Sequence, residues 1–236
     1  MNFAGKVALV TGATKGIGKA VTDIFIRQGG TVIAVGRNSS ALESLKEEYG
    51  EKLLSYQCDV ADEQAVRDLV KAAIDKTGRI DILINNAGIY MEDKAPFVQQ
   101  NSAIWKKKID INILGTLYMT HAVLPHMIAQ RSGRIVNVAS VAGIYGIRDM
   151  VDYSLTKGAI LSFTSGLARE VGEYNITVNA VSPGNINTYN DLPELSYMNR
   201  SGTPEECANV IAFLASDEAS FVSGSNYVVD GSRKKI

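Results

Sequence analysis

The sequence of 236 residues predicts an α/β fold in which a doubly wound parallel sheet of about seven strands is flanked by helices. Short runs rich in Val, Ile and Leu alternate with longer amphipathic stretches over the whole chain. Most runs are nearly continuous in apolar residues, which is typical of strands that are covered on both faces. We expect strands at residues 7–10, 31–35, 53–58, 80–84, 134–139, 176–181 and 227–229.

Helices are expected between these strands, for example at residues 19–28, 41–49, 63–76, 151–171 and 203–215. In the last of these, Pro204 suits the first helical position, and Glu205 and Glu206 complement the positive end of the helix dipole. Trp105 and the basic run Lys106 to Lys108 are expected to mark the solvated start of another helix.

No repeat, low-complexity tract or flexible linker interrupts this alternation, so residues 1–236 are expected to form a single domain. The one long polar stretch without a clear period lies at about residues 185–201. A stretch of this kind is typical of a functional loop, and we expect it to form a lid over the substrate.

The charge balance and the cysteines restrict the partners and the compartment. The chain has 24 Lys and Arg residues against 25 Asp and Glu residues, which argues against nucleic acid or an anionic membrane as the main partner. No apolar run approaches the roughly 20 residues of a membrane span, and the first residues lack a secretory leader. Cys58 and Cys207 are expected to be buried and reduced, so we expect a cytoplasmic protein. His121 and His126 lack the pattern of a metal site, and no metal is expected.

A glycine-rich turn follows the first strand and precedes the first helix. Its residues are Thr11-Gly12-Ala13-Thr14-Lys15-Gly16-Ile17-Gly18, with the spacing G-x3-G-x-G. Glycines in this place let backbone N–H groups approach a pyrophosphate, and the helix N-terminus favours its charge. A tight turn without a ligand is the alternative. The position after the first parallel strand favours a dinucleotide site in a Rossmann-type domain.

A second constellation joins Tyr153 and Lys157 to Ser140. On a helix at residues 151–171 the pair is four residues apart and shares one face. Ser140 follows the strand at residues 134–139, so its hydroxyl is expected at the carboxyl edge of the sheet, where such sheets bind ligands. A neighbouring ammonium can lower the pKa of a phenol. This predicts Tyr153 as a proton donor and acceptor for a carbonyl or carbinol oxygen, with Ser140 as a second hydrogen-bonding group. A solvated Tyr–Lys pair is the alternative.

The end of the second strand indicates which dinucleotide binds. NAD-binding folds usually carry an acid about 20 residues after the glycines, but no acid lies between Asp23 and Glu43. Arg37 stands in that region, and Lys15 in the glycine-rich turn can approach the same group. Because a guanidinium suits phosphate oxygens, these two cations predict NADP(H) as the cofactor.

Together these residues resemble the short-chain dehydrogenase/reductase family over nearly the whole chain, from about Lys6 to Gly231. Within that family the pattern is most similar to 3-oxoacyl-acyl-carrier-protein reductases, and the stretch from Thr203 to Gly224 is also typical of many sugar, polyol and steroid dehydrogenases. The family's elements appear in the usual order and spacing. They are the glycine-rich turn, Asp59-Val60, Asn85-Asn86-Ala87-Gly88, Asn112, Ser140, Tyr153 with Lys157, and Pro183-Gly184 followed by Ile186 and Thr188.

The resemblance implies a role for each of these residues. Asn112 would fix a water that relays protons to Lys157, Asp59 and Val60 would meet adenine, and residues 183–188 would hold the nicotinamide. The catalytic residues would be Asn112, Ser140, Tyr153 and Lys157. The cofactor would be bound by Thr11, Gly12, Lys15, Gly16, Ile17, Gly18, Arg37, Asp59, Val60, Asn86, Ala87, Gly88, Tyr153, Lys157, Pro183, Gly184, Ile186 and Thr188.

The expected function is that of an NADPH-dependent carbonyl reductase or alcohol dehydrogenase, with Tyr153 as general acid and base. A 3-oxoacyl-acyl-carrier-protein reductase is the alternative within the family. A non-catalytic nucleotide-sensing member is a more distant alternative, against which the intact catalytic set argues. Arg131 can serve in a basic dock for acyl carrier protein, but Glu173-Tyr174-Asn175 stands where a second basic residue is usual. A small polar carbonyl substrate is therefore favoured over a carrier-bound one.

The resemblance also implies a homotetramer. The family pairs the helices expected here at residues 111–130 and 151–171, and often packs the last strand near a second two-fold axis. The second of these helices is rich in small and apolar residues, which is consistent with a packed interface.

Overall fold

The computed structural model describes residues 1–90, 94–188 and 193–234 and confirms the α/β fold. Seven parallel strands form one sheet in the order β3-β2-β1-β4-β5-β6-β7. Each strand begins and ends within two residues of its expected bounds. The strands are β1 (Val7–Thr11), β2 (Thr31–Gly36), β3 (Leu53–Gln57), β4 (Ile82–Asn85), β5 (Gly133–Val138), β6 (Ile176–Pro183) and β7 (Asn226–Val229).

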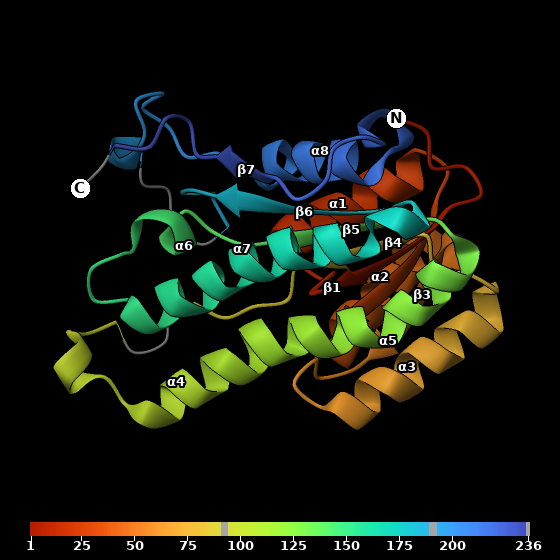
Figure 1. The fold of residues 1–236 in the computed structure, drawn as a ribbon, viewed down its shortest axis with the longest axis horizontal. Helices are drawn as coiled ribbons and strands as arrows, with labels where there is room; N and C mark the ends of the chain where they lie inside the picture. Colours follow the sequence, from red (N-terminus) through yellow and green to blue (C-terminus); the bar gives the residue numbers. More distant parts are fainter. Residues whose placement is uncertain (91–93, 189–192, 235–236) are drawn as a thin grey trace.

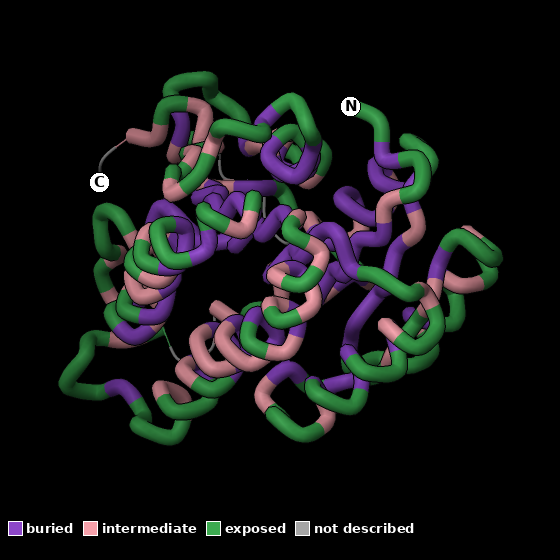
Figure 2. The backbone as a smooth tube through the Cα atoms, turned by 45° about the vertical axis from the view of Figure 1, so that its right-hand side comes forward, coloured by how far each residue is buried: buried purple, intermediate pink, exposed green. Residues whose placement is uncertain are grey.

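Helices cover both faces of the sheet (Figure 1). They are α1 (Gly16–Arg27), α2 (Ser39–Tyr49), α3 (Glu63–Thr77), α4 (Ser102–Ile109), α5 (Gly115–Gln130), α6 (Ala142–Tyr145), α7 (Val151–Val171) and α8 (Pro204–Ala215). Buried residues of α1, α2 and α8 form one apolar cluster with the sheet, and those of α3, α5 and α7 form another. Figure 2 shows the buried chain concentrated at the centre, with exposed segments around it. Burial on both faces explains why most inner strands are nearly continuous in apolar residues, whereas the edge strands β3 and β7 alternate in exposure.

The last helix begins as the sequence predicts, with Pro204 in its first turn. The Thr203 hydroxyl accepts the Glu206 N–H at 3.3 Å, and the Glu206 carboxylate accepts the Thr203 N–H at 2.8 Å, which forms a capping box. Arg200 donates two hydrogen bonds to the same carboxylate and, together with the Thr203 N–H, lowers the pKa of Glu206 to about 2. The end of the expected lid is thereby fastened to α8.

The chain order places a crevice between β1 and β4, because connections from these two neighbouring strands run to opposite sides of the sheet. The Thr11 hydroxyl closes this junction. It accepts the N–H groups of Asn86 at 2.9 Å and Ala87 at 3.0 Å, and it donates to the Ile84 carbonyl at 3.3 Å. The turn after β1 and the turn after β4 are therefore held together at the carboxyl edge of the sheet.

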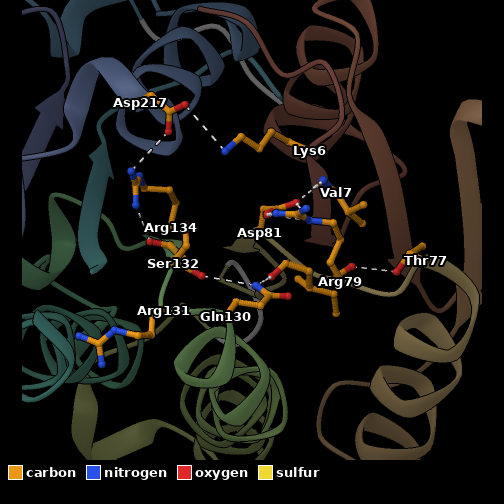
Figure 3. A network of polar contacts seen from close by, with 12 residues as sticks. Lys6, Val7, Thr77, Arg79, Asp81, Gln130, Arg131, Ser132, Arg134 and Asp217 are labelled. Carbon is orange, nitrogen blue, oxygen red and sulfur yellow. Dashed lines mark hydrogen bonds and ion pairs between the residues drawn. The ribbon is translucent and has the colours of Figure 1, made fainter. Parts of the chain in front are cut away.

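The opposite, amino edge of the sheet is closed by a polar network (Figure 3). The buried carboxylate of Asp81 accepts the Val7 N–H at 2.9 Å and two hydrogen bonds from the Arg79 Nε. Asp217 lies between two cations, 3.4 Å from Arg134 Nη2 and 3.8 Å from Lys6 Nζ. These contacts tie the strand starts to one another and to the turn that follows α8.

Two further expectations are decided by the fold, those for Lys108 and for the two cysteines. Lys108 is not solvated, because its ammonium pairs with Asp152 and its side chain is only 1% exposed. Cys58 and Cys207 are free and buried, as expected. Residues 189–192 of the expected lid lie outside the described residues. Among the described residues, no helix is long and apolar enough to span a membrane, and no group of His, Cys, Asp and Glu side chains forms a candidate metal site.

Candidate active site

A cleft of about 770 Å³ opens at the carboxyl edge of the sheet, beside the crevice between β1 and β4. Its walls come mainly from the segments that follow β1, β2, β3 and β4. Seven of the residues expected to bind the cofactor line it, from Gly12 to Gly88. The lining residues are Gly12, Thr14, Lys15, Val35, Gly36, Arg37, Asn38, Ala41, Cys58, Asp59, Val60, Ala87, Gly88, Ile89, Tyr90 and Ile111.

The glycine-rich turn requires its glycines for steric reasons. A Cβ on Gly18 would lie 2.1 Å from the Gly12 carbonyl oxygen, and Gly12 and Gly16 have φ values of +65° and +53°. The Asn86 side chain, which follows β4, donates to the carbonyls of Thr11 at 2.9 Å and Gly12 at 3.1 Å, and these bonds hold the turn in place. The turn is therefore compact, and it directs the start of α1 toward the cleft.

Two cations lie at the outer part of the cleft. The Arg37 side chain is 59% exposed, and its Nη1 lies 3.8 Å from Asp59 Oδ2. Lys15 is the exposed N-cap residue of α1 and lines the same cleft. Asn38 caps α2, since its Oδ1 accepts the Ala41 N–H at 3.1 Å. The starts of two helices and two cations make this part of the cleft favourable for an anionic group.

The segment after β6 reaches the glycine-rich turn. A Cβ on Gly16 would lie 3.2 Å from Thr188 Cγ2, which places Thr188 beside that turn. Ile186 pairs with Gly202 in a parallel bridge, and the Gly184 N–H donates to the Val229 carbonyl at 2.9 Å. The Pro183 carbonyl accepts the Val141 N–H at 3.1 Å, close to Ser140 in the chain. Residues 183–188 thus connect the expected catalytic residues to the cleft.

Ser140, Tyr153 and Lys157 meet where β5 ends against α7. The Ser140 hydroxyl lies close enough to the Tyr153 phenol to act on its pKa, and it accepts the Ala142 N–H at 3.1 Å. The Lys157 Nζ donates to the Val138 carbonyl at 2.7 Å and lies 5.8 Å from the centre of the Tyr153 ring. A phenol and a hydroxyl in this arrangement can both donate to one substrate oxygen.

The protonation of this group differs from the sequence-based expectation of a phenol with a lowered pKa. Burial raises the pKa of Tyr153 to about 12, and the hydrogen bond with Ser140 acts against that rise. Burial also lowers the pKa of Lys157 to about 8. The physical reason is that desolvation dominates and the ammonium is directed at the Val138 carbonyl rather than at the phenol. Tyr153 is consequently a neutral proton donor at pH 7.

Asn112 lies in a π-helical turn, Asp110–Leu114, between α4 and α5. Its Oδ1 accepts the Ile89 N–H, and its Nδ2 donates to the Ile89 carbonyl, each at 2.9 Å. A Cβ on Gly88 would lie 3.3 Å from Asn112 Oδ1 and 3.5 Å from Lys157 Nζ, so both side chains converge on Gly88. The structure therefore brings all four predicted catalytic residues together, and π-helical turns are frequent at functional sites.

Two further side chains belong to this site and were missed by the sequence analysis. The Tyr90 ring lies 5.9 Å from the Tyr153 ring and lines the cleft. Its place two residues after the Asn85-to-Gly88 element was an available signal. The Thr156 hydroxyl donates to the Tyr153 carbonyl at 2.8 Å and accepts a hydrogen bond from Asn112 at 3.0 Å. No local pattern in the sequence distinguishes this threonine.

Comparison with known proteins shows the family of the chain. The family model for short chain dehydrogenases matches residues 6–194. A 3-oxoacyl-(acyl-carrier-protein) reductase, FabG of Thermotoga maritima, is 42% identical over 244 residues, covering 98% of this chain and 98% of the relative. A cyclohexanol dehydrogenase of an Acinetobacter species is 35% identical over 239 residues, covering 97% and 95%.

Solved structures give the same result. The structure of ElxO with NADP bound superimposes with a TM-score of 0.92 at 32% identity, and the match covers 96% of this chain and 97% of ElxO. A Tyr-to-Phe variant of ElxO with NADPH bound matches equally well. The fold, the family model and the full-length relatives agree, and the chain belongs to the short-chain dehydrogenase family.

Proposed function

We propose that the protein is an NADPH-dependent carbonyl reductase that also acts as an alcohol dehydrogenase in the reverse direction. The observation that carries this proposal is that Ser140, Tyr153 and Lys157 meet where β5 ends against α7. These groups lie at the carboxyl edge of the sheet, where the fold binds a dinucleotide. The cyclohexanol dehydrogenase among the relatives supports a ketone or secondary alcohol as substrate.

The residues of the cleft fit an NADP molecule. A volume of about 770 Å³ and glycines that leave no room for a Cβ suit a dinucleotide pyrophosphate at the start of α1. Arg37 and Lys15 suit a 2′-phosphate, because a guanidinium and an ammonium line the cleft and no carboxylate stands at the end of β2. The NADP-bound structure of ElxO supports the same choice for this chain.

The bound nicotinamide supplies the hydride for carbonyl reduction. The residues of the chain would hold and protonate the substrate oxygen. Ser140 and Tyr153 donate hydrogen bonds to that oxygen, and the neutral phenol transfers its proton to it. The Lys157 Nζ lies 5.8 Å from the centre of the Tyr153 ring, and the protonated lysine would supply the proton that returns the phenolate to the neutral phenol. Asn112 and Lys157 both converge on Gly88, and a water held there by Asn112 would replace the proton of Lys157.

A small carbonyl substrate is favoured over a carrier-bound one. Arg131 donates to the Glu173 carbonyl at 2.9 Å and lies over the Tyr174 ring, so its guanidinium is engaged on the surface at the amino edge of the sheet. Within one chain this edge is opposite to Tyr153. The second candidate, a 3-oxoacyl-acyl-carrier-protein reductase, is supported by the 42% identity to the Thermotoga maritima reductase.

A substrate panel tests the proposal and separates the two candidates. Small ketones, sugars and steroids would be compared with acyl-carrier-protein thioesters as substrates. The rate of NADPH oxidation with each would be measured by absorbance. The highest kcat/KM for a small ketone supports the proposal. A much higher value for the carrier-bound thioester supports the second candidate, and no NADPH oxidation with any substrate in the presence of tight NADPH binding supports a nucleotide-sensing protein.

The partners and the domain organisation are part of the same proposal. We expect one domain, no nucleic-acid or membrane partner, a cytoplasmic location and a homotetramer. Support for assembly comes from exposed apolar side chains on α7, Val151 and Leu155, and near the last strand, Phe221 and Val228. Light scattering at micromolar concentration would give the mass of four chains, and the mass of one chain would contradict the assembly.

A further inference from the structure

A buried ion pair lies directly beside the candidate catalytic tyrosine. The Lys108 Nζ is 2.6 Å from Asp152 Oδ2, and the two side chains are only 1% and 3% exposed. Lys108 belongs to the last turn of α4, and Asp152 belongs to the first turn of α7, next to Tyr153. Burying two charges is costly unless they are paired and hydrogen-bonded, so we expect this buried pair to have a specific structural role.

The pair is one of two parallel links between the same segments. The second link runs from Asn112 Nδ2 to the Thr156 hydroxyl over 3.0 Å. Asn112 follows Lys108 by four residues, and Thr156 follows Asp152 by four residues, so the two links lie one helical turn apart. Together they fasten the α4 segment to the first two turns of α7.

Both links end on the backbone of Tyr153. Asp152 Oδ1 accepts the Tyr153 N–H at 2.7 Å, and the Thr156 hydroxyl donates to the Tyr153 carbonyl at 2.8 Å. One carboxylate therefore holds the Lys108 ammonium with one oxygen and the Tyr153 backbone with the other. The peptide groups on both sides of the phenol-bearing residue are fixed by side chains that α4 and the π-helical turn hold in place.

We propose that Lys108 and Asp152 are positioning residues that fix the first turn of α7, so that the Tyr153 phenol stays aligned with Ser140 and the substrate oxygen. This inference rests on the proposed function, because alignment matters only if Tyr153 donates a proton. Removing the ammonium would leave a buried carboxylate without its partner at the point where the Tyr153 N–H is held, and the turn would move to solvate it. Displacements of about 1 Å at a reacting group cost up to about 100-fold in rate.

The chain offers a matched control at the other edge of the sheet (Figure 3). Asp81 is also a buried carboxylate that accepts a backbone N–H, that of Val7, and pairs with a cation, Arg79. An Arg79→Met change disturbs a buried carboxylate far from Tyr153, whereas Lys108→Met disturbs one beside it. General destabilisation affects both variants, and misalignment of the phenol affects only the second.

The experiment compares the unmodified protein with Lys108→Met, Asp152→Asn, the double variant and Arg79→Met, each at a temperature where circular dichroism shows it folded. For Lys108→Met we expect kcat for ketone reduction to fall roughly 10- to 100-fold, with the substrate KM and the NADPH Kd within about threefold. In the double variant, kcat should be at least about tenfold higher than in Lys108→Met. The amide oxygen introduced by Asp152→Asn still accepts the Tyr153 N–H, and no charge is left unpaired. Arg79→Met should keep kcat within about twofold of the unmodified protein.

A second readout does not depend on activity. Hydrogen exchange of the Tyr153 amide, followed by NMR with labelled tyrosine, should become at least about tenfold faster in Lys108→Met and return in the double variant. If Lys108→Met does not fold, Asp152→Asn takes its place in the comparison with the double variant. Asp152→Asn leaves the Lys108 ammonium without its carboxylate, whereas the double variant leaves no charge unpaired.

The inference is overturned if Lys108→Met keeps kcat within twofold, if the double variant is no better than Lys108→Met, or if Arg79→Met loses as much. Failure of the proposed function has a different signature, namely that the unmodified protein reduces no ketone. In that case the hydrogen exchange of Tyr153 decides whether the pair holds this turn, and unchanged exchange overturns it.

Discussion

The ammonium of Lys157 donates a 2.7 Å hydrogen bond to the carbonyl oxygen of Val138, at the end of the strand that leads to Ser140. This contact binds α7 to β5 in the centre of the site. It directs the Lys157 ammonium at a carbonyl oxygen, and burial lowers the pKa of this lysine to about 8. A buried lysine with a lowered pKa has a measurable effect on how stability depends on pH.

Stability relative to a Lys157→Met variant should rise with pH from about 8 to 10.5. In this window the unfolded chain still holds the lysine proton, whereas the folded protein has released it, so deprotonation favours folding. The slope of the difference is at most about 1.4 kcal/mol per pH unit. Urea unfolding of both proteins across this range measures it, since titrations common to both cancel. A difference that stays flat between pH 8 and pH 10 would show that the folded pKa is not lowered.

Gly18→Ala should destabilise the protein by roughly 1–3 kcal/mol and weaken NADPH binding, because the new Cβ meets the Gly12 carbonyl oxygen and opens the turn. Gly166→Ala in α7 is the matched control. A Cβ at Gly166 meets no atom within 4 Å, so this change should stabilise the helix by up to about 1 kcal/mol. Urea unfolding measures the stability of the two variants, and NADPH fluorescence titration measures their Kd for NADPH. Equal behaviour of the two variants would mean that the turn does not need a glycine at position 18.

Arg37→Asp should erase or invert the preference for NADPH over NADH while kcat changes little. Two charged hydrogen bonds to a 2′-phosphate, at about 1.5–3 kcal/mol each, would give a preference of order 100-fold or more. The ratio of kcat/KM values for the two cofactors measures it. Arg67→Asp is a suitable control, since this arginine lies on α3 with a side chain that is 56% exposed, against 59% for Arg37. An unmodified enzyme that uses NADH as well as NADPH would refute the assignment.

The sheet and the cleft were predictable because their signals are local. Continuous apolar runs predicted most of the strands, and Gly18 stands where a Cβ would meet the Gly12 carbonyl. The helix at Val151–Val171 has the expected bounds, so Tyr153 and Lys157 share a face as predicted.

Two features could not be predicted because they depend on distant contacts. Lys106, Lys107 and Lys108 form one basic run, and only the fold brings Asp152 to the last of them. The direction of the Tyr153 pKa shift depends on burial and on where the Lys157 ammonium points, and the sequence contains neither. Thr156 joins Asn112 to Tyr153 for the same reason, through a contact between helices that are remote in the chain.

The central claim, that Tyr153 protonates the substrate in an NADPH-dependent ketone reduction, is tested most directly by the kcat of Tyr153→Phe. The change removes one hydroxyl from a half-buried ring and leaves Lys157 and the cleft in place. We expect kcat to fall by about 10²–10⁴-fold while the Kd for NADPH stays within a few-fold. Tyr56→Phe in β3 should leave both values unchanged. If Tyr153→Phe kept more than about a tenth of the activity, another group would have to supply the proton, and the account would be wrong.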